Sequence, residues 1–135
     1  MNKPLEILNF TGEGYKPLVF SADWQVAQLN WEQVFDLHNA GEIERHLNSD
    51  EVFILWKGKA VLFLSTNDEM QVEEMETGVI YNVGAGVWHN LLATRDAAWI
   101  IVENRDTHVD DTHIRQMTSQ EWQTLRQNLP AWLQE

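Results

Sequence analysis

Apolar and polar residues alternate along most of the chain from Ile43 to Glu103, which is the period of a β-strand with one buried face. Turns rich in Gly, Asn, Asp and Thr interrupt the alternation, and Lys57-Gly58 between two hydrophobic segments predicts a tight hairpin. The pattern predicts seven short strands, at residues 43–47, 51–56, 59–65, 70–74, 79–83, 87–94 and 97–103. Short strands at this regular spacing indicate an all-β sandwich or barrel.

Two more strands and one helix are predicted outside this segment. Residues 15–20 and 24–31 are strand-like and follow an N-terminal arm of residues 1–14, whereas residues 32–42 form a loop or a short helical turn. Near the C-terminus, the sequence Thr-Ser-Gln-Glu at 118–121 matches a capping box, and Trp122, Leu125 and Leu129 then fall on one helical face. We therefore expect a short C-terminal helix over about residues 119–129.

The composition is that of one globular domain spanning residues 1–135. Hydrophobic residues make up 44% of the chain and charged residues 22%, and no apolar segment approaches the roughly 18 residues that a membrane helix requires. The first six residues lack the apolar stretch of a secretory signal. We expect a soluble, cytoplasmic protein without a membrane partner.

Charge and cysteine content narrow the partners and cofactors. The formal net charge of −12 repels a phosphate backbone, and the few Lys and Arg residues are scattered, so nucleic acid is not expected as a partner. The chain has no cysteine, which excludes disulfides, iron–sulfur clusters and thiolate zinc. A metal would be held by His, carboxylate or other oxygen ligands, which suit Fe, Mn, Zn, Ni, Co and Cu.

Four residues in the alternating segment are candidate metal ligands. Glu44 and His46 lie two residues apart and therefore point to the same side of a strand. Glu51 returns to that side if residues 48–50 form a bend, and His89 has apolar residues two positions away on each side, which places its imidazole on an inward face. Two imidazoles and a carboxylate are the ligand types of the facial triad that binds Fe(II). The other explanation of such histidines is a hydrogen-bonded position in the core.

A second group of histidines and carboxylates follows the last predicted strand. It comprises His108, Asp110, Asp111 and His113. The segment is polar and turn-like, and charged groups in such segments are usually solvated. We expect a solvated surface here and no metal site.

The segment Glu44-x-His46-x4-Glu51-x6-Gly58 resembles the first motif of the cupin superfamily, which is His-x-His, three or four residues, Glu, six residues, Gly. Three of the four motif positions match. The departure falls on a functional position, because Glu44 stands where the family has its first metal-binding His. The first motif is in this sense degenerate.

The segment Gly78-x5-Gly84-x-Gly86-x2-His89 resembles the second cupin motif, which is Gly-x5-Pro-x-Gly-x2-His-x3-Asn. Gly84 replaces the Pro of the family pattern and Ala93 replaces its terminal Asn. The resemblance covers roughly residues 40 to 105 and implies a double-stranded β-helix, the cupin jelly-roll barrel, in a small single-domain protein (a monocupin).

By position, the resemblance implies His46, Glu51 and His89 as metal ligands and Glu44 as a possible fourth. The implied cofactor is a divalent transition metal, which would be Fe, Mn, Zn or Ni. Glu44 has a second possible role as a catalytic acid or base beside the metal, because a buried carboxyl group near another has a raised pKa. The third possibility is that the Glu44 carboxylate has no role at the metal and is simply satisfied by Arg45 or by a group on a neighbouring strand.

Four inward-facing side chains are candidates for the wall of a mostly apolar pocket, with the tyrosine as a polar contact. They are Phe53, Leu55, Phe63 and Tyr81. Ordinary core packing would explain these residues equally well.

The sequence leaves two functions open. One is a metal-dependent enzyme that acts on a small polar metabolite through open coordination positions, and the other is a module that binds a sugar or another small metabolite without catalysis. The cupin resemblance does not separate them, because the superfamily includes both kinds of protein. It does imply a homodimer that pairs through its N-terminal strands, for which the tryptophan-rich first 31 residues would supply the surface.

Overall fold

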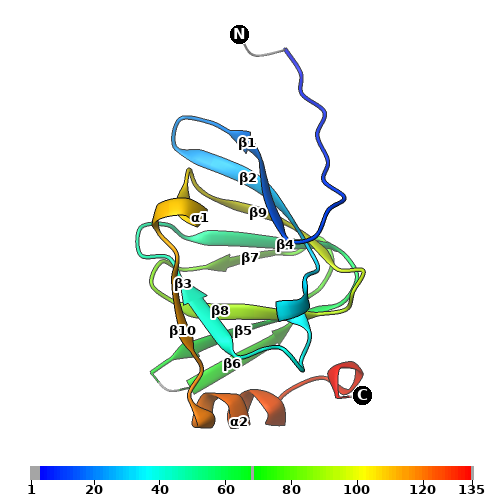
Figure 1. Cartoon of the computed structure of the whole chain (residues 1–135), viewed down its shortest axis with the longest axis vertical. Coiled ribbons are helices and arrows are strands. Elements are labelled where there is room, and N and C mark those ends of the chain that lie inside the picture. The colour runs from blue at the N-terminus through cyan, green and yellow to red at the C-terminus, as the bar shows by residue number, and fades with distance from the viewer. Residues whose placement is uncertain (1–3, 68, 135) are drawn as a thin grey trace.

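In the described part of the chain, ten strands form two five-stranded antiparallel sheets that pack face to face (Figure 1). The computed structural model describes residues 4–67 and 69–134. The first sheet has the order β1 (Tyr15–Phe20), β2 (Trp24–Asn30), β9 (Ala98–Asn104), β4 (Glu51–Lys57), β7 (Ile80–Val83). The second sheet has the order β10 (His113–Gln116), β3 (Glu42–Arg45), β8 (Trp88–Ala93), β5 (Ala60–Thr66), β6 (Glu69–Glu74). Successive strands from β3 to β9 alternate between the sheets except along the hairpin β5–β6, which gives the predicted jelly-roll barrel.

All nine predicted strands are present, with ends displaced by one or two residues. Three elements after β9 were not predicted: the short helix α1 (Thr107–Asp110), the edge strand β10 and the 3₁₀ helix η2 (Ala131–Leu133). Strand β10 pairs with β3 along one side only, and three of its four residues are exposed. Its sequence therefore lacks the alternation of apolar and polar residues by which the other strands were predicted. The first three residues of the predicted N-terminal arm, Asp68 in a predicted turn and Glu135 lie outside the described residues.

The main core lies between the two sheets. Its largest member is Trp99 of β9, which is fully buried and contacts the ring of Phe35 edge-on, with 5.4 Å between the ring centroids. Phe35 belongs to the short 3₁₀ helix η1 (Gln33–Phe35), which is the helical turn expected in residues 32–42. Alternate residues of β4, β9 and β2 point into this core, as the sequence pattern predicts.

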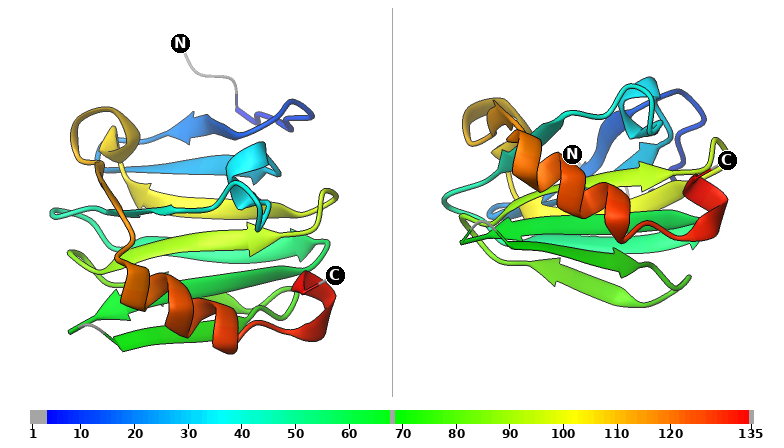
Figure 2. Two further views of the ribbon diagram at one scale, coloured as in Figure 1. Left: turned by 60° about the horizontal axis from the view of Figure 1, so that its bottom comes forward. Right: turned by 90° about the horizontal axis from the view of Figure 1, so that it is seen from below.

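The C-terminal helix α2 (Ser119–Gln127) covers the outer face of the second sheet (Figure 2). Thr118 and Glu121 form the predicted capping box, in which each side chain accepts a hydrogen bond from the other residue's backbone N–H. Leu125 and Leu129 of the helical segment pack with Phe63 of β5, so both faces of β5 are buried. Phe63 therefore faces the helix, and the prediction that it points into the barrel is wrong.

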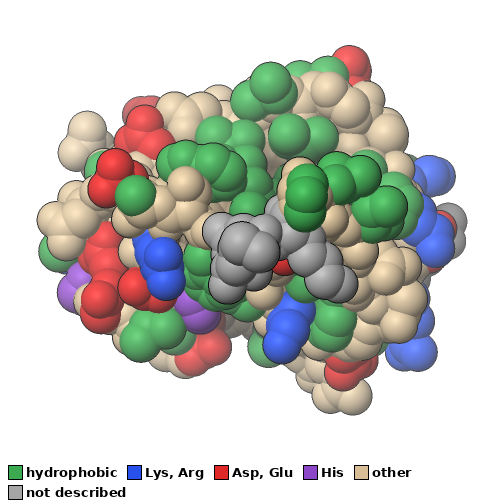
Figure 3. All heavy atoms as spheres, turned by 90° about the horizontal axis from the view of Figure 1, so that it is seen from above, with side chains coloured by type: hydrophobic (Ala, Val, Ile, Leu, Met, Phe, Trp, Pro, Cys, Tyr) green, Lys and Arg blue, Asp and Glu red, His purple; other side chains and the backbone are tan. Residues whose placement is uncertain are grey.

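The outer face of the first sheet is apolar, and no helix within residues 4–67 and 69–134 covers it. We call it the outer apolar face; its side chains belong to four adjacent strands and are partly or fully exposed: Trp24, Val26, Val52, Ile54, Ile80, Ile100 and Val102. The arm of residues 4–13 joins the same sheet where Phe10 and Gln28 exchange two hydrogen bonds, and beyond that point Leu5 and Ile7 are exposed. Hydrophobic side chains gather at this end of the molecule around the arm (Figure 3).

No helix in the described part of the chain has the length and apolar character needed to span a membrane.

Candidate metal centre

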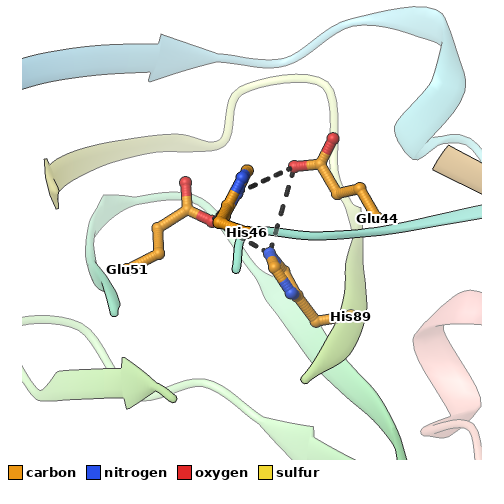
Figure 4. Close-up of side chains that lie close together, drawn as sticks. All are labelled: Glu44, His46, Glu51 and His89. Atoms are coloured by element: carbon orange, nitrogen blue, oxygen red, sulfur yellow. Dashed lines mark hydrogen bonds and ion pairs between the residues drawn. The ribbon is translucent and has the colours of Figure 1, made fainter. Parts of the chain in front are cut away.

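Four side chains from three strands and one loop meet inside the barrel (Figure 4). Glu44 of β3 lies opposite His89 of β8 in the register of the second sheet. His46 follows the end of β3, and Glu51 is the first residue of β4 in the first sheet. One ligand atom from each of the four residues lies within 4.8 Å of every other. The structure thus brings together all four ligands that the sequence predicted.

Glu51 lies at the centre of this cluster. Its Oε1 is 3.0 Å from Nε2 of His46 and 2.9 Å from Nε2 of His89. Glu44 Oε1 is 3.8 Å and 3.9 Å from the same two nitrogens, on the side away from Glu51. The two histidines and Glu51 are buried, whereas 35% of the Glu44 side chain is exposed. Glu44 is therefore the member of the cluster that reaches the solvent-accessible side.

Backbone carbonyl groups orient both imidazole rings. Nδ1 of His46 lies 2.8 Å from the carbonyl oxygen of Asp111, and Nδ1 of His89 lies 2.9 Å from that of Val87. A carbonyl oxygen only accepts hydrogen bonds, so each Nδ1 carries a hydrogen. The Nε2 atoms consequently face the carboxylates, and when they are unprotonated they present lone pairs to a common point.

The two histidines and Glu51 shift one another's pKa values in opposite directions. Burial alone would lower the pKa of His46, but the hydrogen bond and charge of Glu51 outweigh burial and raise it to about 9. The pKa of His89 is raised by the same partner against the same opposing effect of burial. Burial alone would raise the pKa of Glu51, whereas its two histidine partners lower it well below its usual range. In the absence of a metal, the imidazoles of His46 and His89 are therefore ion-paired with the Glu51 carboxylate. Protons lie between the imidazole Nε2 atoms and Oε1 of Glu51.

This donor set fits a divalent transition metal. Imidazole nitrogen and carboxylate oxygen suit Fe, Mn, Zn and Ni, and the hydrogen bonds at Nδ1 are the supporting contacts usual for metal-binding histidines. A cation would also replace the protons as the positive charge next to Glu51.

A cavity of about 430 Å³ opens onto the cluster. That volume is in the range of small-molecule sites. Glu44, His46, Glu51 and His89 all line it, and so does Phe53, one of the four predicted pocket residues.

The other predicted pocket residues lie elsewhere. Leu55 is part of the core between the sheets, and Phe63 packs against α2. Tyr81 packs at the edge of the core, and its hydroxyl accepts a hydrogen bond of 2.9 Å from the backbone N–H of Glu76. None of the three lines the cavity, because Leu55 packs in and Tyr81 against the core between the sheets and Phe63 faces α2.

Asp111 belongs to the second histidine and carboxylate group, and the prediction that this residue is solvated is wrong. The residue is buried, and its side chain accepts hydrogen bonds of 2.9 Å and 2.8 Å from the backbone N–H groups of Leu47 and Asn48. Its carbonyl group orients His46. His113 is exposed, as expected for this segment. Asp111 is thus a supporting residue of the site that joins the loop after β3 to the C-terminal segment.

A polar network that the sequence analysis did not identify occupies one wall of the cavity. The Tyr15 hydroxyl and, at 3.4 Å, Nε2 of Gln25 donate to the carboxyl group of Glu103, which lies opposite Glu51 in the register of β4 and β9. Burial, followed by the charge of Glu51, raises the pKa of Glu103 to about 7. Burial, followed by the charge of Glu103, also raises the pKa of Tyr15, so its hydroxyl stays protonated. The sequence did contain one sign of this network, because Glu103 is an acidic residue at an inward-facing position of its strand.

Metal binding is expected to release protons. The pKa of His46 is about 9 in the ion-paired cluster, so its imidazole holds an extra proton at neutral pH that a metal must displace. The pKa of His89 is raised by the same partner, which favours a proton on that imidazole as well. Affinity should rise with pH up to about 9 and level off above it. Calorimetry at pH 7 in buffers of different ionisation enthalpy should count between about one and two protons released. Affinity that does not change between pH 6 and 9 would contradict the ion-paired arrangement.

No protein-family model matches the chain, and no curated protein matches it. Solved structures do match. A cupin-2 domain protein from Shewanella frigidimarina is 23% identical, with a TM-score of 0.52 over 71% of this chain and 85% of that chain. A variant of Streptomyces PAC13 with uridine is 10% identical, with a TM-score of 0.58 over 82% of this chain and 86% of that one.

A third match is Fe(II)-HppE with an alternative substrate, at 16% identity and a TM-score of 0.51. It covers 74% of this chain and 54% of that chain. These similarities, together with the two sheets, define the fold class of the protein. The chain has the fold of the small single-domain cupins.

Proposed function

We propose that this protein is a metal-dependent enzyme that acts on a small polar metabolite in the cavity. His46, Glu51 and His89 hold the metal in this proposal. The observation that carries it is the orientation of both Nε2 atoms toward one carboxylate oxygen, which places three donor groups around one point at the end of a cavity of ligand size. The expected metal is Fe, Mn, Zn or Ni. Such an ion supplies polarisation of a substrate oxygen or activation of a water molecule.

Glu44 is the proposed catalytic acid or base and a possible fourth ligand. Burial, followed by the charge of Glu51, raises the pKa of Glu44, and its side chain is the partly exposed member of the cluster. A carboxyl group with a raised pKa exchanges protons more readily near neutral pH. The residue therefore stands where it can transfer a proton to or from a molecule bound in the cavity.

Metal analysis tests the proposal. Protein purified without nickel resin is expected to contain close to one metal ion per chain, and the double variant His46→Ala/His89→Ala is expected to contain none. The matched control is His38→Ala/His113→Ala, which removes two exposed histidines and should keep the metal. Substoichiometric metal in the wild type, or unchanged metal in the first double variant, would refute the proposal.

One observation favours the alternative of a non-catalytic binding protein. The two histidines and Glu51 satisfy one another by hydrogen bonds without an ion, so the cavity does not need a metal to be complete. In that case a ligand would raise the melting temperature equally well in the presence of EDTA. For the enzyme, we expect EDTA to abolish this ligand stabilisation.

We also propose that the protein is a homodimer. The outer apolar face exposes apolar side chains on four strands, and the adjacent arm exposes Leu5 and Ile7, which together would be covered by a second copy. Light scattering should give the mass of a dimer, and Ile54→Asp should shift it to a monomer. Val109→Asp on the exposed helix α1 is the control that should remain dimeric. A monomeric mass for the wild type would contradict this proposal.

A further inference from the structure

The cavity is lined by glutamates and, among the described residues, by no lysine or arginine. Five glutamates contribute to the lining: Glu32, Glu42, Glu44, Glu51 and Glu103. A divalent ion at the cluster would offset two negative charges and leave an excess when the remaining carboxyl groups are ionised. An anionic ligand would meet this excess without a cationic side chain to pair with it. The lining therefore disfavours phosphate- and carboxylate-bearing ligands.

Hydrogen bonds fix the direction of the network on the cavity wall. The backbone N–H of Asp106 donates to Oε1 of Gln25 at 2.9 Å, so Nε2 of Gln25 is the donor end of the amide. This Nε2 donates to the hydroxyl oxygen of Tyr15 at 2.8 Å and to Nδ1 of His108 at 3.0 Å. Because the Tyr15 oxygen accepts from Gln25, the Tyr15 hydroxyl hydrogen goes to Oε2 of Glu103.

The other oxygen of this carboxyl group has no partner. Oε1 of Glu103 is buried and makes no hydrogen bond to any described residue, and the whole side chain is only 5% exposed. A buried carboxyl oxygen without a hydrogen bond is unfavourable, and such groups commonly mark positions that a ligand or water satisfies. Glu103 lines the cavity and lies opposite the candidate ligand Glu51 in the register of β4 and β9.

We propose that Oε1 of Glu103 accepts a hydrogen bond from a hydroxyl group of the ligand, and that the cavity selects hydroxyl-bearing molecules that carry no phosphate or carboxylate group. The proposal rests on the proposed function in that the same cavity holds the metabolite. Part of the lining is apolar, from Leu29, Phe35, Phe53 and Leu91, which suits the carbon face of such a molecule.

Matched pairs of probes test the selection by charge. The pairs are uridine with uridine 5′-phosphate and xylose with xylonate, measured by calorimetry on metal-loaded protein at about pH 8.5, where the carboxyl group of Glu103 is ionised because its pKa is about 7. In at least one pair, the uncharged member should bind about tenfold or more tightly than the anionic one. Equal or tighter binding of the anionic members, or no binding of either uncharged probe, would overturn the proposal.

The variant Glu103→Gln tests the role of the free oxygen. Because the Tyr15 hydroxyl still needs an acceptor, the amide oxygen should take the place of Oε2 and the NH₂ group that of Oε1, which turns an acceptor into a donor. The uncharged probe that binds the wild type should bind about tenfold or more weakly. Glu73→Gln, the same change at an exposed position of β6, should bind it as the wild type does.

Two further measurements keep the outcome decisive. Glu103→Asp retains the charge and withdraws the oxygen from the cavity, so it should weaken the same probe even if Glu103→Gln does not fold. Wild-type affinity in either folded Glu103 variant would overturn the proposal. Metal content is measured in every sample. Absence of metal from the wild type would count against the metal-dependent function. Probe binding to the metal-free wild type and Glu103 variants would still test the role of Glu103.

Discussion

Replacing Glu51 with alanine is expected to abolish metal binding and to destabilise the metal-free protein. Its Oε1 is the atom that both imidazole Nε2 groups share, at 3.0 Å for His46 and 2.9 Å for His89. Removing one partner of a buried ion pair leaves the others without compensation, which typically costs about 3 to 5 kcal/mol. Metal affinity should fall by more than about 100-fold, since even supporting residues of metal sites account for about 10- to 100-fold.

Urea denaturation in EDTA gives the stability of the variant, and metal analysis of dialysed protein gives its occupancy. Glu44→Gln is the informative comparison, because Glu44 lies at the edge of the cluster and is partly exposed. If Glu44 acts as the acid or base, the Glu44→Gln variant keeps its metal and loses turnover. If Glu44 is a ligand, the variant loses both the metal and turnover. Glu51→Ala with wild-type metal content would disprove the assignment of Glu51 as a ligand.

Asp111→Ala is expected to weaken metal binding by about 10- to 100-fold, although Asp111 is not a ligand. The carboxylate holds the backbone of Leu47 and Asn48, and the carbonyl of the same residue orients His46. Without the side chain, two N–H groups lose their acceptor and the loop that carries His46 is released from the C-terminal segment. Metal titration of the purified variant measures the effect.

Asp111→Asn retains one side-chain acceptor and should restore part of the affinity. His113→Ala removes the exposed neighbour, whose Nε2 lies 3.5 Å from the Asp111 carboxylate, and should bind metal almost as the wild type does. Equal loss in both alanine variants would show that the effect is not specific to the hydrogen bonds of Asp111.

The convergence of the four candidate ligands was predictable because they lie on or next to strands whose alternation is visible in the sequence. Glu44 and His46 share a face, and His89 has apolar neighbours in phase with it, so their convergence follows from strand geometry. Phe63 was assigned to the wrong side for a related reason. Helix α2 buries the outer face of β5, so both faces of that strand are hydrophobic and alternation no longer tells inside from outside.

Asp111 and the network at Glu103 depend on contacts that the sequence does not encode locally. Asp111 contacts residues more than sixty positions away, and nothing in its polar surroundings distinguishes it from a solvated aspartate. Glu103 gave a signal, an acidic residue in phase with the buried Trp99 and Ile101, but its free oxygen emerges only once Tyr15 and Gln25 are placed beside it. Local pattern thus predicts the strands and their faces, and tertiary contacts decide which polar groups are satisfied.

The hydrogen bonds of Asp111 also set an order of events during protein synthesis. The candidate ligands lie at residues 44 to 89, so they leave the ribosome well before the segment that orients His46. Until residue 111 has emerged and docked, the His46 ring lacks its carbonyl partner and the loop of Leu47 and Asn48 lacks its acceptor. A nascent chain should therefore capture metal only late, when the last part of the barrel closes, which delays tight binding until the correct ligands are held together.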